Sequence, residues 1–243
     1  MIGRRAVRGI CLVLAAAFCM AWAGVAAYAR SDSDVGKDPV ALQQLADKDD
    51  AKAQRTLAGM YALGQGVPKD LARAAALFQK AADQGDAQAQ NDLGTLYVRG
   101  LGVPKDSAKA AELYRKAANQ GDMNAQYNLG RLYSLGQGVP QDHAKAAAFY
   151  QKAADQGNAW AQNSLGILYA EGRVVPQDYA KAFKLFQQAA DQGDMLAQTN
   201  LGLLYVEGHG VPKDVEKGCS LLRDAAAKGL RSAQEASDSY CPR

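Results

Sequence analysis

GVPKD stands at Gly66–Asp70, Gly102–Asp106 and Gly210–Asp214, with GVPQD at Gly138–Asp142 and the variant VVPQD at Val174–Asp178. The five phrases therefore start 36 residues apart, and the sequence around them repeats with them. A fixed period of roughly 20–50 residues indicates a solenoid, in which each unit buries its apolar face only against its neighbours. The copies run over residues 50–85, 86–121, 122–157, 158–193 and 194–229.

Each copy predicts two helices, which we call helix A and helix B. In the second copy, Asp86 is a natural N-cap for a helix A that runs to about Val98. Residues 100–104 then break the pattern, because Gly permits a positive φ and Pro cannot continue a helix. Asp106 caps helix B, and Gly121 ends it. The sequence therefore predicts an all-α fold of antiparallel helix-turn-helix hairpins.

Small and amide side chains recur within the helices. A Gly in mid-helix costs about 1 kcal/mol, so Gly94 and its counterparts predict close approach of another backbone, with Ala117–Ala118 as the matching surface. A Gln that recurs in helix A, as at Gln90, is expected to bond the backbone of the Asp-Gln-Gly turns, with a ligand role as the alternative. A Lys or Arg row on helix B, as at Lys109, is interpreted as a solvated outer face.

These motifs together resemble a known family. The pattern A-x-x-x-L-G-x-L-Y, then G-x-G-V-P-x-D, then A-x-x-L-Y-x-K-A-A-x-Q-G is similar to the Sel-1-like repeat, a relative of the tetratricopeptide repeat, and recurs five times over residues 50–229. The resemblance implies a right-handed α-solenoid whose A helices line the concave surface. It also implies an adaptor that binds other proteins, without naming a partner.

The N-terminus has the features of a targeting segment. Three Arg precede an apolar run from Ile10, and Ala27-Tyr28-Ala29 fits a small-x-small cleavage site, so we expect a signal peptide cut after Ala29. The alternatives are an uncleaved span of about 20 residues, twin-arginine export and a lipid anchor on Cys19. We expect a periplasmic or secreted protein that meets a membrane only through an uncleaved leader.

Charge bears on the class of partner. The chain has 28 basic and 25 acidic residues, and losing the three leader Arg leaves 25 of each. A chain without net charge has no long-range field to concentrate on a phosphate backbone, so nucleic acid is not expected as a partner.

Two Cys remain after the leader. Cys241 falls 36 residues after Tyr205, in a helix A slot, and Cys219 takes a helix B slot. Two Cys in an exported chain favour a disulfide, which would stabilise the folded chain by about 3 kcal/mol. Two free thiols are the alternative.

The flanks of the repeats are interpreted as caps. Residues 38–49 and 230–243 align with single helices of the repeat, and solenoids need such polar ends. Residues 30–37 are interpreted as a flexible linker.

Motifs for catalysis are missing from the sequence. The chain has two His without zinc-ligand spacing, and it has no Ser-x-x-Lys, phosphate loop or dinucleotide fingerprint. We therefore expect no enzyme activity, metal or cofactor. A cell-wall or β-lactam hydrolase, suggested by cysteine-rich relatives of the family, is the alternative.

The helix A slots that vary between copies are the candidate partner site. The second, fifth and ninth residues after the N-cap share one arc opposite the packed one, and they change from polar and basic to aromatic and aliphatic along the chain. An exposed apolar patch of this kind marks partner sites. We expect a monomer that binds a protein or peptide through Tyr127, Arg131, Trp160, Asn163, Ile167, Leu196, Thr199 and Leu203. Packing of the apolar ones against neighbouring repeats or the C-terminal cap is the alternative.

Overall fold

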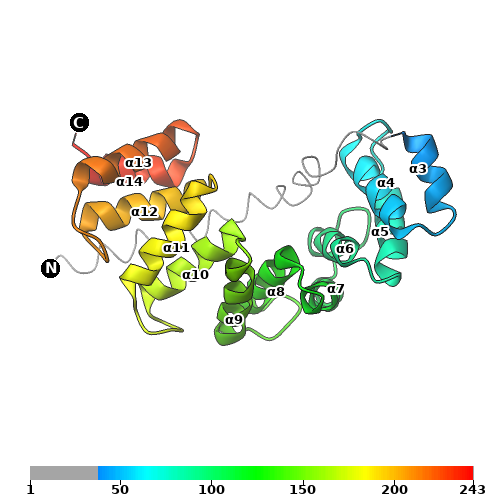
Figure 1. Cartoon of the computed structure of the whole chain (residues 1–243), viewed down its shortest axis with the longest axis horizontal. Coiled ribbons are helices and arrows are strands. Elements are labelled where there is room, and N and C mark those ends of the chain that lie inside the picture. Colours follow the sequence, from blue (N-terminus) through cyan, green and yellow to red (C-terminus); the bar gives the residue numbers. More distant parts are fainter. Residues whose placement is uncertain (1–37, 243) are drawn as a thin grey trace. The chain divides into compact units, whose positions relative to one another are not determined.

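A computed structural model describes residues 38–242, and the predicted leader and linker lie outside them. The described chain consists of helices and turns without a strand, and it divides into two compact units within α9, between Ala146 and Ala147. Figure 1 shows the helices in chain order. The first unit holds α3 (Pro39–Ala46), α4 (Ala51–Leu63), α5 (Leu71–Asp83), α6 (Ala87–Arg99), α7 (Ser107–Asn119), α8 (Met123–Leu135) and the start of α9 (His143–Asp155). The second unit holds the rest of α9, α10 (Ala159–Glu171), α11 (Tyr179–Asp191), α12 (Met195–Glu207), α13 (Val215–Ala227) and α14 (Arg231–Tyr240).

Local capping sets the helix bounds. Asp86 accepts a hydrogen bond from the Ala89 amide at 2.7 Å, so α6 starts one residue after it. Gly100 ends α6 in the left-handed region at φ 68°. Asp106 caps α7 through the Lys109 amide at 2.9 Å, and Gly121 follows α7 with φ 94°. The predicted hairpin is confirmed.

The Gly of the repeated phrase is required for steric reasons as well as for its positive φ. A Cβ on Gly102 would overlap the backbone carbonyl of Leu71, the first residue of the preceding helix B, and Gly102 also has φ 71°. The same overlap recurs between Gly210 and Tyr179 in the second unit. The phrase therefore joins helix A to helix B and also lets the turn lie against the hairpin before it.

The mid-helix Gly residues meet side chains rather than the expected backbone. A Cβ on Gly94 would lie 2.8 Å from the Tyr114 ring, and one on Gly166 would lie 2.6 Å from the Phe186 ring. The prediction that Ala117–Ala118 face these glycines is wrong, because the aromatic residue of helix B fills that space. At Gly202 backbone does come close, with the Gly218 carbonyl oxygen 3.0 Å from an added Cβ.

Candidate partner-binding face

The varying residues lie along one side of the A helices, which we call the A face. It comprises the second, fifth, sixth, ninth and thirteenth residues after each N-cap, which fall within an arc of about 100° on a helix. In the first unit the A face is mostly polar and comprises Lys52, Arg55, Thr56, Gly59, Leu63, Gln88, Asn91, Asp92, Thr95, Arg99, Asn124, Tyr127, Asn128, Arg131 and Leu135. In the second unit it includes Trp160, Asn163, Ser164, Ile167, Leu196, Thr199, Asn200 and Leu203.

Polar contacts join successive A helices of the first unit. Arg55 of α4 places its Nε 3.3 Å from the Asp86 carboxylate at the start of α6. Asn128 of α8 donates to the Asn91 side-chain oxygen at 2.9 Å, and Asn91 donates to Asp92 at 3.2 Å. The face is thus a connected polar surface across α4, α6 and α8.

Asp92 is the most perturbed carboxyl of this surface. Burial raises its pKa to about 7, against the lowering effects of the Asn91 hydrogen bond and the Arg55 charge. The neighbouring carboxylates Asp122 and Asp86 raise the pKa further. Asp92 therefore changes charge close to neutral pH.

A hydroxyl pair lies between α6 and α7. The Tyr114 hydroxyl is 3.0 Å from the Thr95 hydroxyl, and either of the two can donate; the Thr95 hydroxyl also lies 3.2 Å from the Asn91 carbonyl oxygen. Burial raises the pKa of Tyr114 to about 12, whereas the Thr95 hydrogen bond and the charges of Arg131 and Arg99 lower it.

Two of the predicted site residues of the first unit are brought together. The Arg131 guanidinium lies over the Tyr127 ring, 5.8 Å from its centroid, and both side chains are half-buried. Such stacking fixes the orientation of the guanidinium plane.

In the second unit, the prediction of an exposed apolar patch is wrong. Ile167, Leu196 and Leu203 are buried, with exposed fractions of 2%, 6% and 3%. Leu196 packs with Leu230 and Ala233, and Leu203 packs with Ala236 and Tyr240, so α14 covers both. Ile167 is buried against α11 and α12.

The polar predicted residues of the second unit are also mostly internal. Asn163 is buried and accepts a hydrogen bond from Asn200 at 2.9 Å. Thr199 is fully buried and donates to the Met195 carbonyl at 2.8 Å. Trp160 is half-buried, so of the predicted residues in this unit it alone keeps substantial accessible surface.

Sequence reasoning missed Asp92, Tyr114 and Arg99, although a signal for Tyr114 was present. Its helix B slot holds Tyr where the ninth residue of helix A is polar, as in Thr95. It holds Phe or Leu where that residue is apolar, as in the pairs Ile167–Phe186 and Leu203–Leu222. Matching these two slots would have linked α6 to α7.

The recurring Gln residues bond backbone as predicted. Gln54, Gln90 and Gln126 donate to carbonyls at the end of the preceding helix, at 3.0, 3.1 and 3.3 Å. The turn after the following helix B also supplies a Gln donor, as where Gln120 of the Asn119-Gln120-Gly121 turn donates to Gln90 at 2.9 Å. These contacts satisfy buried amides and bind successive hairpins together.

The basic row on the B helices pairs within the chain. Lys109 lies 3.8 Å from the Asp106 cap and over the Tyr97 ring, and Lys145 repeats this with Asp142 at 3.1 Å. The row is exposed and locally neutralised, in agreement with a solvated outer face.

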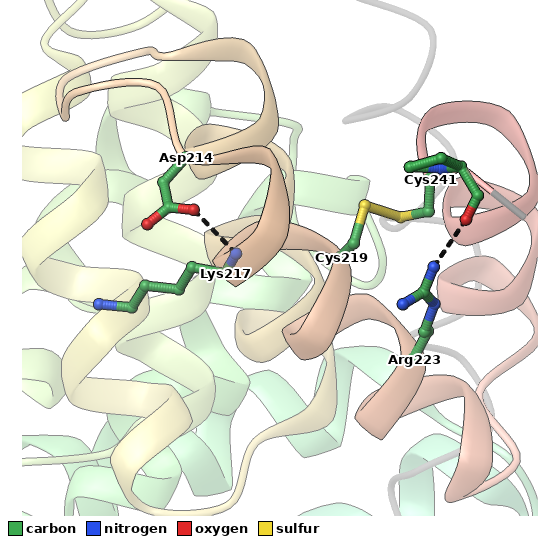
Figure 2. The surroundings of a disulfide bond; sticks show 6 residues. Asp214, Lys217, Cys219, Arg223 and Cys241 are labelled. Atoms are coloured by element: carbon green, nitrogen blue, oxygen red, sulfur yellow. Dashed lines mark hydrogen bonds between the residues drawn. A yellow bond between two sulfur atoms is a disulfide. The ribbon is translucent and has the colours of Figure 1, made fainter.

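Figure 2 shows the cysteine pair at the end of the second unit. Cys219 of α13 and Cys241 lie with their sulfur atoms at disulfide distance and their Cα atoms 5.5 Å apart. Arg223 donates to the Pro242 carbonyl at 2.8 Å beside them. These two links tie the end of α14 to α13.

Two further kinds of site, a metal cluster and a membrane-spanning helix, are absent from residues 38–242. No group of three or more His, Cys, Asp or Glu residues in that range is arranged to hold a metal ion. Of the helices in the same range, none is both long and apolar enough to cross a bilayer.

Known proteins resemble this chain in sequence and structure. The Sel1 repeat model matches residues 51–86, 87–122, 124–158, 161–194 and 196–230. The structure of c5321, a protective antigen of uropathogenic Escherichia coli, matches with 35% sequence identity and a TM-score of 0.74. This match covers 82% of the present chain and 42% of the c5321 chain. A Sel1 repeat protein from Oxalobacter formigenes is also 35% identical with a TM-score of 0.74, covering 85% and 60%.

A third structure, a Sel1 repeat protein from Klebsiella pneumoniae, is 27% identical with a TM-score of 0.55 and covers 84% of this chain and 99% of its own. This chain thus spans about two fifths and three fifths of the first two proteins. No curated protein matches it. Five matched repeats covering most of the chain decide the family: the protein is a member of the Sel1 repeat family.

Proposed function

We propose that this chain is an exported, non-enzymatic scaffold that binds a segment of a partner protein through the A face of its first unit. The observation that carries the proposal is the contrast between the two units. The A face of the first unit is polar, varied and partly accessible, whereas most of the same slots in the second unit are buried. A solenoid varies where it contacts a partner and repeats where it contacts itself.

A half-buried aromatic residue supports this role. Tyr127 stands in an A-face slot of the first unit and keeps part of its side chain accessible, and such residues supply much of the binding energy at protein interfaces. Tyr127 also carries the stacked Arg131, so cation and ring are presented together. We expect the partner to be a protein or peptide rather than nucleic acid, because the mature chain has no net charge.

The export part of the proposal rests on two features. The N-terminal sequence has the order of a signal peptide, and the pair Cys219–Cys241 suits an oxidising compartment. A related structure described as a protective antigen fits this location. Sequencing the N-terminus of the protein recovered from the periplasm tests it, and a chain that still begins at Met1 would contradict cleavage after Ala29.

A crosslinking pull-down tests the binding role. The mature chain is compared with Tyr127→Ala, Trp160→Ala and the control Phe149→Ala, which removes a half-buried aromatic from the B helix α9. We expect loss of the captured partner with Tyr127→Ala and retention with Phe149→Ala. Equal capture by all three variants would exclude the A face as the binding surface.

A further inference from the structure

The arginines of the first unit's A face differ in how they are paired. Arg55 is within 3.3 Å of the Asp86 carboxylate. For Arg99 and Arg131, no carboxylate between residues 38 and 242 lies within ion-pair distance. Arg131 has the Tyr127 ring as its neighbour, which leaves the edge of its guanidinium fork available to a ligand.

Arg99 carries an unsatisfied donor. Its Nη1 atom is buried and has no hydrogen-bond partner within the described part of the chain. An unsatisfied buried donor costs about 1–3 kcal/mol, and more when the group is charged, so such atoms are rare unless a ligand completes them. The guanidinium of Arg99 is therefore not fully hydrogen-bonded within residues 38–242.

The two arginines lie on successive A helices of the first unit, Arg99 on α6 and Arg131 on α8. The charges of both act on the Tyr114 phenol, which lies against Thr95 at 3.0 Å. Thr95 precedes Arg99 by four residues in α6, so the two side chains stand one turn apart on the same stripe. Arg131 holds the same slot in α8 as Thr95 holds in α6.

We propose that Arg99 and Arg131 bind carboxylate groups of an acidic segment of the partner protein. A guanidinium presents paired N–H donors in a plane that matches a carboxylate, and neither arginine is paired with a carboxylate between residues 38 and 242. This inference rests on the proposed function, because it names the chemistry of the segment that the A face binds.

The remaining charges on the face favour a peptide over a phosphate polymer. Asp92 lies on the A face, and the charges of the N-caps Asp86 and Asp122 act on it, so these carboxylates oppose a continuous line of phosphates. A peptide can place isolated carboxylates at the arginines and uncharged residues beside the aspartates. The acidic character is therefore required only at the Arg99–Arg131 end.

The experiment measures binding of labelled peptides to the mature chain by fluorescence anisotropy. The probes are short peptides that alternate Gly with Glu, Gln or Lys, together with a single-stranded oligonucleotide. The variant Arg99→Gln/Arg131→Gln is compared with Arg115→Gln/Lys116→Gln, which removes two charges from exposed positions on α7 of the same unit. The variant Arg99→Lys/Arg131→Lys keeps the charges and removes the forked donors.

We expect the Glu peptide to bind best and to lose roughly tenfold or more in affinity for each arginine replaced by Gln. The Lys variant should lose less than the Gln variant, and the α7 control should stay within about twofold. Circular dichroism that matches the unmodified chain shows that the variants fold.

Several results would overturn the inference. They are an undetectable affinity for the Glu peptide, equal binding by the Gln variant and the control, or tighter binding of the oligonucleotide. If the Gln or Lys peptide binds more tightly than the Glu peptide, and Tyr127→Ala abolishes that binding, the proposal of an acidic partner segment is overturned. The A face then remains the proposed binding surface. A partner captured equally by every A-face variant would instead remove the proposed function.

Discussion

Replacing Cys219 and Cys241 by Ser should release the end of α14 from α13. The link closes a loop with a sequence separation of 22 residues, for which loop-closure entropy gives about 3 kcal/mol. The α14 helix is short, from Arg231 to Tyr240, and its N-cap Leu230 makes no side-chain cap hydrogen bond. Without the link, α14 depends on the contacts of Ala233, Ala236 and Tyr240 with α12 and α13.

Native-state hydrogen exchange measures this release segment by segment. A local loss of about 3 kcal/mol corresponds to exchange of the α14 amides that is faster by roughly 100-fold, while the amides of α6 stay unchanged. The control Arg223→Gln removes only the hydrogen bond to Pro242 at 2.8 Å and should cost about 1 kcal/mol or less. Unchanged protection of α14 in the double Ser variant would refute the view that the cysteine link holds this cap in place.

Three further substitutions test the packing and the charges. Leu203→Ala should lower the free energy of unfolding in urea by about 2–5 kcal/mol because the Leu203 side chain is 3% exposed. The control Leu135→Ala, whose side chain is 48% exposed, should change it by less than about 0.5 kcal/mol. Equal effects of the two substitutions would show that α14 leaves Leu203 exposed. Gly94→Ala should destabilise by about 1–3 kcal/mol because the new methyl lies 2.8 Å from the Tyr114 ring, and a gain of about 1 kcal/mol from helix propensity would show that the ring moves freely. Because burial raises the pKa of Asp92 to about 7 from 3.8, the folded chain keeps a proton that the unfolded chain releases, so the stability from this group is present below about pH 4 and is lost as the pH rises to about 7. The free energy of unfolding of Asp92→Asn minus that of the unmodified chain should therefore be larger at pH 8 than at pH 5 by more than about 1 kcal/mol. A difference that is the same at both pH values would contradict the raised pKa.

The helix bounds could be predicted because their causes are local. Asp86 and Asp106 cap helices a few residues away, and Gly100 ends one by its own backbone conformation. The partners of Gln90 were also within reach, since the Asp-Gln-Gly turn that it contacts recurs at a fixed distance in the sequence.

The accessible face could be predicted only in part. Leu196 and Leu203 occupy the slots that vary, but their exposure depends on how α14 packs, and periodicity within one repeat does not contain that information. The ring that meets Gly94 comes from helix B, so its identity follows from the packing of two helices rather than from the glycine itself.

The polar site needed the structure for a similar reason. Arg99 is the last residue of α6 and Arg131 lies in the middle of α8, so their common relation to Tyr114 depends on the stagger of successive hairpins. The varying slots mark Arg131 as a candidate in the sequence, whereas Arg99 has no such signal there. The buried and unsatisfied Nη1 of Arg99 is visible only in the structure.

Site-specific photocrosslinking tests the central claim most directly. A photoreactive residue at Gln88 samples the A face of α6, and one at Glu112 samples the exposed side of α7, since both positions are exposed in the first unit. The account predicts that a partner is captured from Gln88 and not from Glu112, and that Arg99→Gln/Arg131→Gln lowers the yield. Capture of the same partner from Glu112 alone would contradict it, because the binding surface would then lie on the repeated helix B side.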